Sequence, residues 1–136
     1  MHMPGCHLTW IMALLLSGCA SMPARQCAAG EESFVNEQLY FGTEKPGGVI
    51  GSQEWEEFLA SAVTPRFPRG LSVWPASGQW QGANGTITRE SSYVLSLIHP
   101  DDAHSEAAVR AIAAEYKTRF QQEAVLRIKS RVCASF

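Results

Sequence analysis

Four side chains with the chemistry of catalysis are spread along this 136-residue sequence: Tyr40, Arg66, Glu90 and His99. Tyrosine, glutamate and histidine act as general acids or bases, and arginine stabilises developing negative charge. Nothing in their spacing predicts that they converge in one site, and CxxC, HExxH and GxSxG motifs are lacking. We therefore expect a noncatalytic domain without a cofactor. The alternative is a small-molecule enzyme with a site near residues 64–68, Glu90 and His99.

Arginine and glutamate also form structural ion pairs. Arg66 and Arg69 flank a Pro-Phe-Pro segment, and Glu90 and Glu123 lie near the ends of expected elements. A partly buried pair of this kind is more often an architectural contact than a catalytic dyad.

The segment HPDDAH at residues 99–104 offers imidazole and carboxylate groups that suit several divalent metals. Acidic residues before a helix are also favoured by the helix dipole alone. We expect Asp101 and Asp102 to open a helix and His99 to end a strand, so no metal site is predicted.

The first 24 residues contain no Lys, Arg, Asp or Glu. Their apolar run, Leu8 to Leu16, is about half of the roughly 20 residues that span a bilayer as a helix, and its length is typical of a secretory signal peptide. An ordinary secretory cleavage site and a buried N-terminal helix are the alternatives. The segment before this run carries no Lys or Arg, which departs from the usual pattern.

The tetrapeptide LSGC at residues 16–19 looks like the lipobox of bacterial lipoproteins. This resemblance implies that residues 1–18 are a signal peptide and that the thiol of Cys19 takes the diacylglycerol, with fatty acids such as palmitate. Ala20 implies transfer to the periplasmic face of an outer membrane. We expect residues 19–32 to be a lipidated cysteine and flexible tether, and residues 33–136 to be one domain.

The composition agrees with one small domain. The chain is 46% hydrophobic and 18% charged, with a formal net charge of −2. Nucleic-acid-binding domains are usually basic, so that class is disfavoured.

Periodicity predicts six elements in the domain. They are strands at 34–41, 71–81, 86–98 and 125–136 and helices at 52–64 and 100–120. We expect a kink or bulge at 75–78 and a two-residue turn at Asn84-Gly85, which would place Trp80 opposite Arg89. The order β-α-β-β-α-β predicts a ferredoxin-like α+β fold, with a four-stranded antiparallel sheet and two helices on one face.

This topology brings the start of the first strand beside the end of the last. Cys27 and Cys133 lie at those two positions, and Cys6 and Cys19 have other expected roles. We therefore expect a Cys27–Cys133 disulfide; two unpaired cysteines are the alternative.

The helices cover only one face of such a sheet. We expect the uncovered face to be a partner surface for a second copy of the chain or an envelope component, displaying aromatic and basic side chains: Tyr40, Trp74, Arg127, Lys129 and Arg131. The alternative is a solvated edge strand whose basic residues discourage aggregation.

The domain also resembles a family of small bacterial envelope proteins that is grouped as a domain of unknown function. Six segments carry the resemblance: LYFG (39–42), TPRFP (64–68), GLSV (70–73), GQW (78–80), HP (99–100) and CASF (133–136). TPRFP is the marker motif. The resemblance implies export and the fold described above, and it implies no particular activity.

Overall fold

The computed structural model describes residues 26–136, so the expected signal peptide and Cys19 lie outside the described residues. Four long strands alternate with two helices in the order β1 (Glu32–Gly42), α1 (Ser52–Phe58), β4 (Ser72–Gln81), β5 (Ile87–His99), α2 (Ala103–Phe120) and β6 (Leu126–Ala134). A small hairpin of β2 (Glu44–Lys45) and β3 (Gly48–Val49) occupies the expected loop after β1. No helix in this part of the chain is long and apolar enough to cross a membrane.

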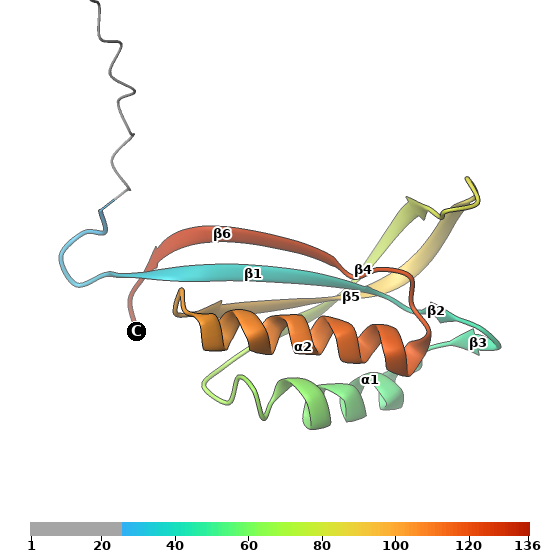
Figure 1. Cartoon of the computed structure of the whole chain (residues 1–136), viewed down its shortest axis with the longest axis horizontal. Helices are drawn as coiled ribbons and strands as arrows, with labels where there is room; N and C mark the ends of the chain where they lie inside the picture. Colours follow the sequence, from blue (N-terminus) through green and yellow to red (C-terminus); the bar gives the residue numbers. More distant parts are fainter. Residues whose placement is uncertain (1–25) are drawn as a thin grey trace, which may run out of the picture.

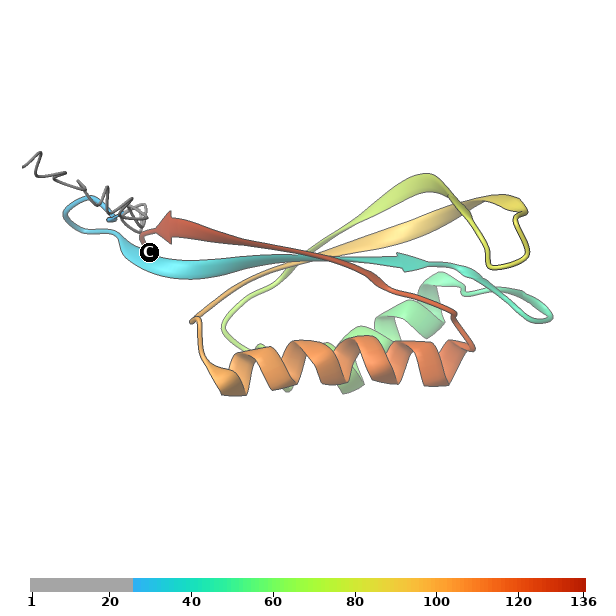
Figure 2. The ribbon, with the colours of Figure 1, turned by 45° about the horizontal axis from the view of Figure 1, so that its top comes forward.

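The sheet has the strand order β4-β5-β1-β6, with every neighbouring pair antiparallel. Both helices lie on one face of it, and the other face carries no helix (Figures 1 and 2). We call this second face the open face. The arrangement confirms the ferredoxin-like prediction.

Aromatic rings fill the space between the helices and the sheet. Phe41 from β1 contacts Trp55, Phe58 and Tyr116 with ring centroids 4.6–5.8 Å apart. All four side chains are buried. The Tyr116 hydroxyl donates to the Gly42 carbonyl at 2.8 Å, which satisfies its polar end inside the core.

Both helices begin with a polar contact that the local sequence supplies. Asp102 precedes α2 and accepts a hydrogen bond from the Ser105 amide at 2.7 Å. The residue before α1 is Gly51, not the expected Ser52, and Glu54 accepts from its amide at 3.1 Å. The helical turn after α1, Leu59–Val63, has π geometry, and the segment ends before Pro65 as predicted.

The β4–β5 hairpin differs from the prediction at two points. Its pairing runs without a bulge from Ser72 opposite Ser96 to Gln81 opposite Ile87. The strand continues through residues 75–78, as predicted, but without the expected bulge, because β4 is an edge strand, where Pro75 interrupts no inner ladder. The loop spans residues 82–86, so Trp80 lies opposite Thr88 and not Arg89.

The disulfide between Cys27 and Cys133 is present, with their Cα atoms 5.4 Å apart. It joins the segment before β1 to the end of β6, as the topology predicted. Glu32 already pairs with Ala134 in the sheet. The folded unit therefore reaches back to Cys27, into the segment expected to be tether.

The register of β6 reverses the faces that we expected for its side chains. Leu39, which is buried under the helices, lies opposite Arg127, and Tyr40 on the open face lies opposite Leu126. Arg127, Lys129 and Arg131 therefore point to the helix side of the sheet, and their assignment to the open face is wrong. A shift of one residue exchanges the two faces of a strand, and alternation alone does not decide which face is which.

Candidate functional site

A buried carboxylate explains the orientation of β6. Glu37 lies between Val35 and Leu39 on the helix face of β1 and is fully buried. Arg127 pairs with both of its oxygens, from Nε at 2.6 Å and from Nη2. A buried charge needs such a partner, so the opposite register would leave Glu37 unpaired.

The same arginine extends the contact to α2. Its Nη1 and Nη2 donate to the two Glu106 oxygens at 2.8 and 2.6 Å. Arg110 and Lys129 also donate to Glu106, at 2.7 and 3.0 Å. These hydrogen bonds, led by that of Arg127, hold the pKa of the Glu106 carboxyl well below its usual range. The pKa of Arg127 is raised, mainly by its hydrogen bonds to Glu37 and then Glu106.

His99 lies beside this ionic cluster and is nearly inaccessible to solvent. Its Nδ1 lies 2.7 Å from the Pro100 carbonyl, and its Nε2 lies 3.7 Å from Glu37 Oε1 without a hydrogen-bond partner. Burial closes the Glu37–His99 pair to a substrate. We interpret it as an architectural contact between β1, β5 and β6.

Glu37 was not among the residues singled out from the sequence, although a signal was present. In the run FVNEQLYF the residues facing the helices alternate, so the choice of Leu39 and Phe41 also places Glu37 on that face. A charge at a core position in such an alternation predicts a buried partner.

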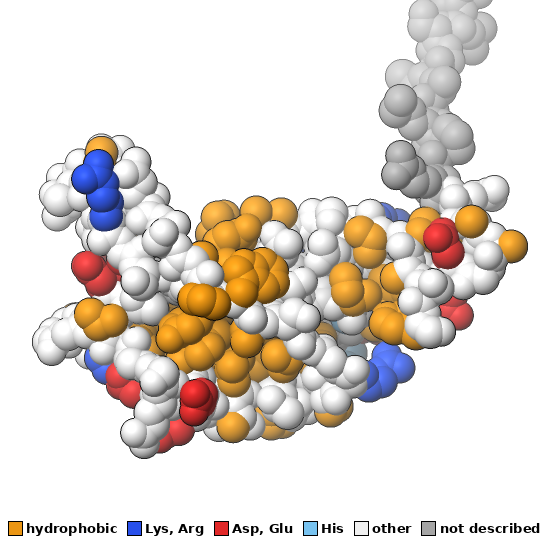
Figure 3. All heavy atoms as spheres, turned by 180° about the vertical axis from the view of Figure 1, so that it is seen from behind, with side chains coloured by type: hydrophobic (Ala, Val, Ile, Leu, Met, Phe, Trp, Pro, Cys, Tyr) orange, Lys and Arg blue, Asp and Glu red, His pale blue; other side chains and the backbone are white. Residues whose placement is uncertain are grey.

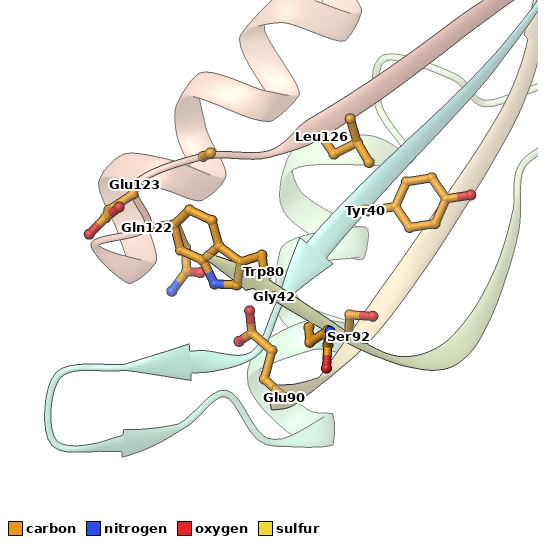
Figure 4. Close-up of a pocket in the computed structure, with 11 residues that line it drawn as sticks. Tyr40, Gly42, Trp80, Glu90, Ser92, Gln122, Glu123 and Leu126 are labelled. Atoms are coloured by element: carbon orange, nitrogen blue, oxygen red, sulfur yellow. The ribbon is translucent and has the colours of Figure 1, made fainter. Parts of the chain in front are cut away.

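A pocket of about 220 Å³ opens at the other end of the sheet, next to the β4–β5 hairpin (Figure 4). It lies between the open face and the connection from α2 to β6. Its lining comprises Tyr40, Gly42, Gly78, Gln79, Trp80, Glu90, Ser92, Gln122, Glu123, Ala124 and Leu126.

Of the four catalytic candidates, only Tyr40 and Glu90 line this pocket. Arg66 instead donates to the Ala62 carbonyl and pairs with Glu115 at 3.2 Å, so the expected pairing with Glu90 or Glu123 is wrong. His99 packs near Phe67 of the TPRFP segment, with ring centroids 5.7 Å apart. Glu90 and His99 are nine positions apart in β5, which is about 30 Å of extended strand. They do not share a site.

The HPDDAH segment is divided among separate roles. Asp102 caps α2, and Asp101 pairs with Arg131 at 2.6 Å. His99 is buried beside Glu37, whereas His104 is exposed. Within residues 26–136 no three His, Cys, Asp or Glu side chains are grouped so that they could hold a metal ion.

The open face is apolar and uncharged across its middle. One row of cross-strand neighbours consists of Leu126, Tyr40, Val94 and Trp74. Leu126 and Trp74 are 58% and 40% exposed, while Val94 between them is covered. The registers place Glu32 and Glu90 at opposite ends of this face, and every open-face strand residue between those ends is neutral. The view from behind shows hydrophobic side chains gathered in the middle of the molecule, beside the projecting hairpin (Figure 3).

Comparison with protein families gives one match, to a protein of unknown function, DUF3574, over residues 36–136. The chain belongs to this family. The match covers nearly all of the folded DUF3574 domain seen here, from β1 to the C-terminal residue. No curated protein matches the sequence significantly.

Solved structures resemble the DUF3574 domain in fold. A phage SAM lyase in complex with S-methyl-5'-thioadenosine superposes with a TM-score of 0.59 at 15% identity, covering 85% of this chain and 97% of that one. CutA from Synechococcus elongatus PCC7942 gives a TM-score of 0.52 at 13% identity, covering 77% of this chain and 83% of CutA. At these identities the likeness concerns the fold alone.

Proposed function

We propose that this DUF3574 protein is an exported, lipid-anchored bacterial envelope protein whose folded domain is a noncatalytic interaction module. Its open face is the interaction surface, and a second copy of the chain is its first partner. The observation that carries this proposal is the neutral row of side chains across the four strands, which is exposed at Trp74 and Leu126.

The composition of this row is that of an interface core. Charged residues are depleted at the centres of protein interfaces, while aromatic residues are enriched. Trp74 and Leu126 stay exposed at the two edges of the sheet, with Tyr40 and Val94 between them. A partner would remove this apolar surface from water, which is favourable in proportion to the area buried.

Neutrality also favours a second copy over an anionic envelope component. In a two-fold interface the same patch faces itself, so a charged face would meet like charges. The basic residues expected to attract an anionic partner point to the other side of the sheet, where Arg127 and Lys129 pair with Glu106. The middle of the open face therefore has no charge repulsion to overcome on meeting itself.

Substitution of the exposed tryptophan at one end of the row tests this proposal. Trp74→Asp would place two like charges in a self-associated interface and should convert dimers to monomers at micromolar concentration. Val49→Asp is the matched control, because Val49 is 61% exposed on the β2–β3 hairpin. Sedimentation velocity of the full-length protein in detergent measures the association state. A monomer in the unmodified protein, or dimers that survive Trp74→Asp, would contradict self-association through this face.

Export is supported by the Cys27–Cys133 disulfide. Structural disulfides persist in oxidising compartments such as the bacterial periplasm and are rare in the cytosol. Together with the resemblance of residues 16–19 to a lipobox, this bond supports a location outside the inner membrane, at the periplasmic face of an outer membrane.

A small-molecule enzyme is the second candidate, and the pocket that contains Tyr40 and Glu90 favours it. The sequence predicted such an enzyme with Arg66 and His99 in the same site as Glu90. The structure does not support that arrangement, because Arg66 and His99 lie outside the pocket. The likeness to a phage SAM lyase supports the fold and transfers no activity at this identity. Because the four catalytic candidates do not share a site, we rank binding above catalysis.

A further inference from the structure

The charged side chains that line the pocket beside the hairpin are all acidic. Its eleven residues include the carboxylates of Glu90 and Glu123 and no Lys, Arg or His. The amide nitrogen of Gln122 donates to the Glu44 and Phe120 carbonyls at 2.6 and 3.1 Å, which leaves its oxygen as an acceptor. The pocket is thus rich in acceptors and negative charge.

Glu90 is held in the wall of the pocket by the backbone. Its Oε2 accepts a hydrogen bond from the Glu44 amide at 2.9 Å. The carboxylate lies against Gly42, where any larger residue would place its Cβ in the space of the carboxylate. In the described residues Glu90 forms no ion pair, so its charge is positioned without a cation of the protein.

An aromatic side chain, Trp80, lies next to Glu90 in the pocket. The indole of Trp80 is 40% exposed and lies between Glu90 and Glu123, with Tyr40 further along the pocket (Figure 4). The face of an indole attracts cations through its quadrupole, most strongly when the site is partly desolvated. Leu126 contributes apolar surface to the same wall.

We propose that this pocket binds a small organic cation, an ammonium group that carries small apolar substituents. Trp80 contacts the substituents, and Glu90 provides the counter-charge. The volume of about 220 Å³ equals that of roughly seven liquid waters at about 30 Å³ each, which accommodates a group of the size of choline. The inference goes beyond the proposed self-association and depends on Trp80 and Glu90, not on Trp74.

Calorimetric titration of the full-length protein with choline and with 3,3-dimethyl-1-butanol tests the proposal. The alcohol has nearly the same shape as choline but carries carbon in place of the charged nitrogen. We expect choline to bind at least about tenfold more tightly than the alcohol, and Glu90→Gln to weaken choline binding by about tenfold. Glu56→Gln removes the same charge from an exposed position of α1 and should leave the affinity unchanged.

Gly42→Ala provides an independent variant, because the added methyl group would displace the Glu90 carboxylate while the charge remains. It should also weaken choline binding. Free choline and vesicles of phosphatidylcholine distinguish a soluble cation from a lipid headgroup as the source of the ammonium; Glu90-dependent binding to either supports the site. Equal affinity for choline and the neutral alcohol, or no choline binding at about 10 mM, would overturn the proposal. Neither result would bear on self-association, which Trp74→Asp tests.

Discussion

Glu37 is a charged residue in the buried part of the domain. Its carboxylate is completely buried, and Arg127 on the neighbouring strand β6 donates hydrogen bonds both to it and to Glu106 on α2. A buried ion pair contributes less to stability than its Coulomb attraction implies, because both charges lose water. Its clearest effect is to favour the register of β6 against β1 that brings Arg127 to Glu37.

Removing one partner of this pair should therefore be costly. Arg127→Met leaves the Glu37 carboxylate buried without its cation, and we expect it to lower the free energy of unfolding by about 3 kcal/mol, the lower end of the range for broken buried pairs. Urea denaturation at pH 7 measures the change.

Two further variants make the interpretation specific. The double variant Glu37→Leu/Arg127→Met replaces the pair with apolar side chains and should recover most of the lost stability. Arg89→Met is the control: Arg89 is exposed and its side chain donates one hydrogen bond, to Gln79, so the substitution should change stability by less than about 0.5 kcal/mol. If Arg127→Met cost no more than Arg89→Met, the ion pair would have no stabilising role.

At the scale of elements, the pairing of β1 with β6 joins the two ends of the folded unit. Their ladder runs from Glu32 opposite Ala134 to Tyr40 opposite Leu126. The disulfide closes the same ladder at its outer end and links residues 106 positions apart. The start of β1 and the end of β6 are thereby held together at one end of the sheet.

The disulfide should stabilise the domain mainly by restricting the unfolded chain. For a loop of this length the chain-entropy estimate is about 5 kcal/mol. We expect the double variant Cys27→Ser/Cys133→Ser to lose about that much in urea denaturation. Reductant should have a similar effect on the unmodified protein and none on the double variant. Equal stability with and without reductant would show that this bond contributes little.

At the scale of the whole molecule, the described residues divide into three surfaces with different chemistry. The helix side carries the ionic cluster of Glu37, Arg127 and Glu106. The open face is neutral across its middle, and the pocket at its hairpin end is acidic and aromatic. The first described residues lie at the disulfide end of the domain, remote from the β4–β5 hairpin (Figure 1).

The anchor itself is a prediction about Cys19. Radiolabelled palmitate should be incorporated into the unmodified protein and lost in Cys19→Ser, because serine lacks the thiol that accepts the lipid. Cys27→Ser is the control, since its thiol is expected in the disulfide and not in the lipid linkage. Incorporation that persists in Cys19→Ser would contradict the lipoprotein prediction.

The features that follow from local periodicity and from the order of elements could be predicted from the sequence. The apolar spacing of Trp55, Phe58 and Ala62 predicted α1, and the similar spacing from Val109 to Phe120 predicted α2, because burial repeats with the helical period. The order of elements then placed Cys27 beside Cys133. These inferences needed no knowledge of which residues face each other across the sheet.

The contacts that depend on strand register required the folded structure. The alternation of β6 fits either face, and the choice that pairs Arg127 with Glu37 follows from the cost of burying an unpaired charge. The hairpin loop likewise moved Trp80 from Arg89 to Thr88. The pocket is lined by residues of β1, β4, β5 and the α2–β6 connection. Glu90, Trp80 and Glu123 therefore come together only in the folded domain.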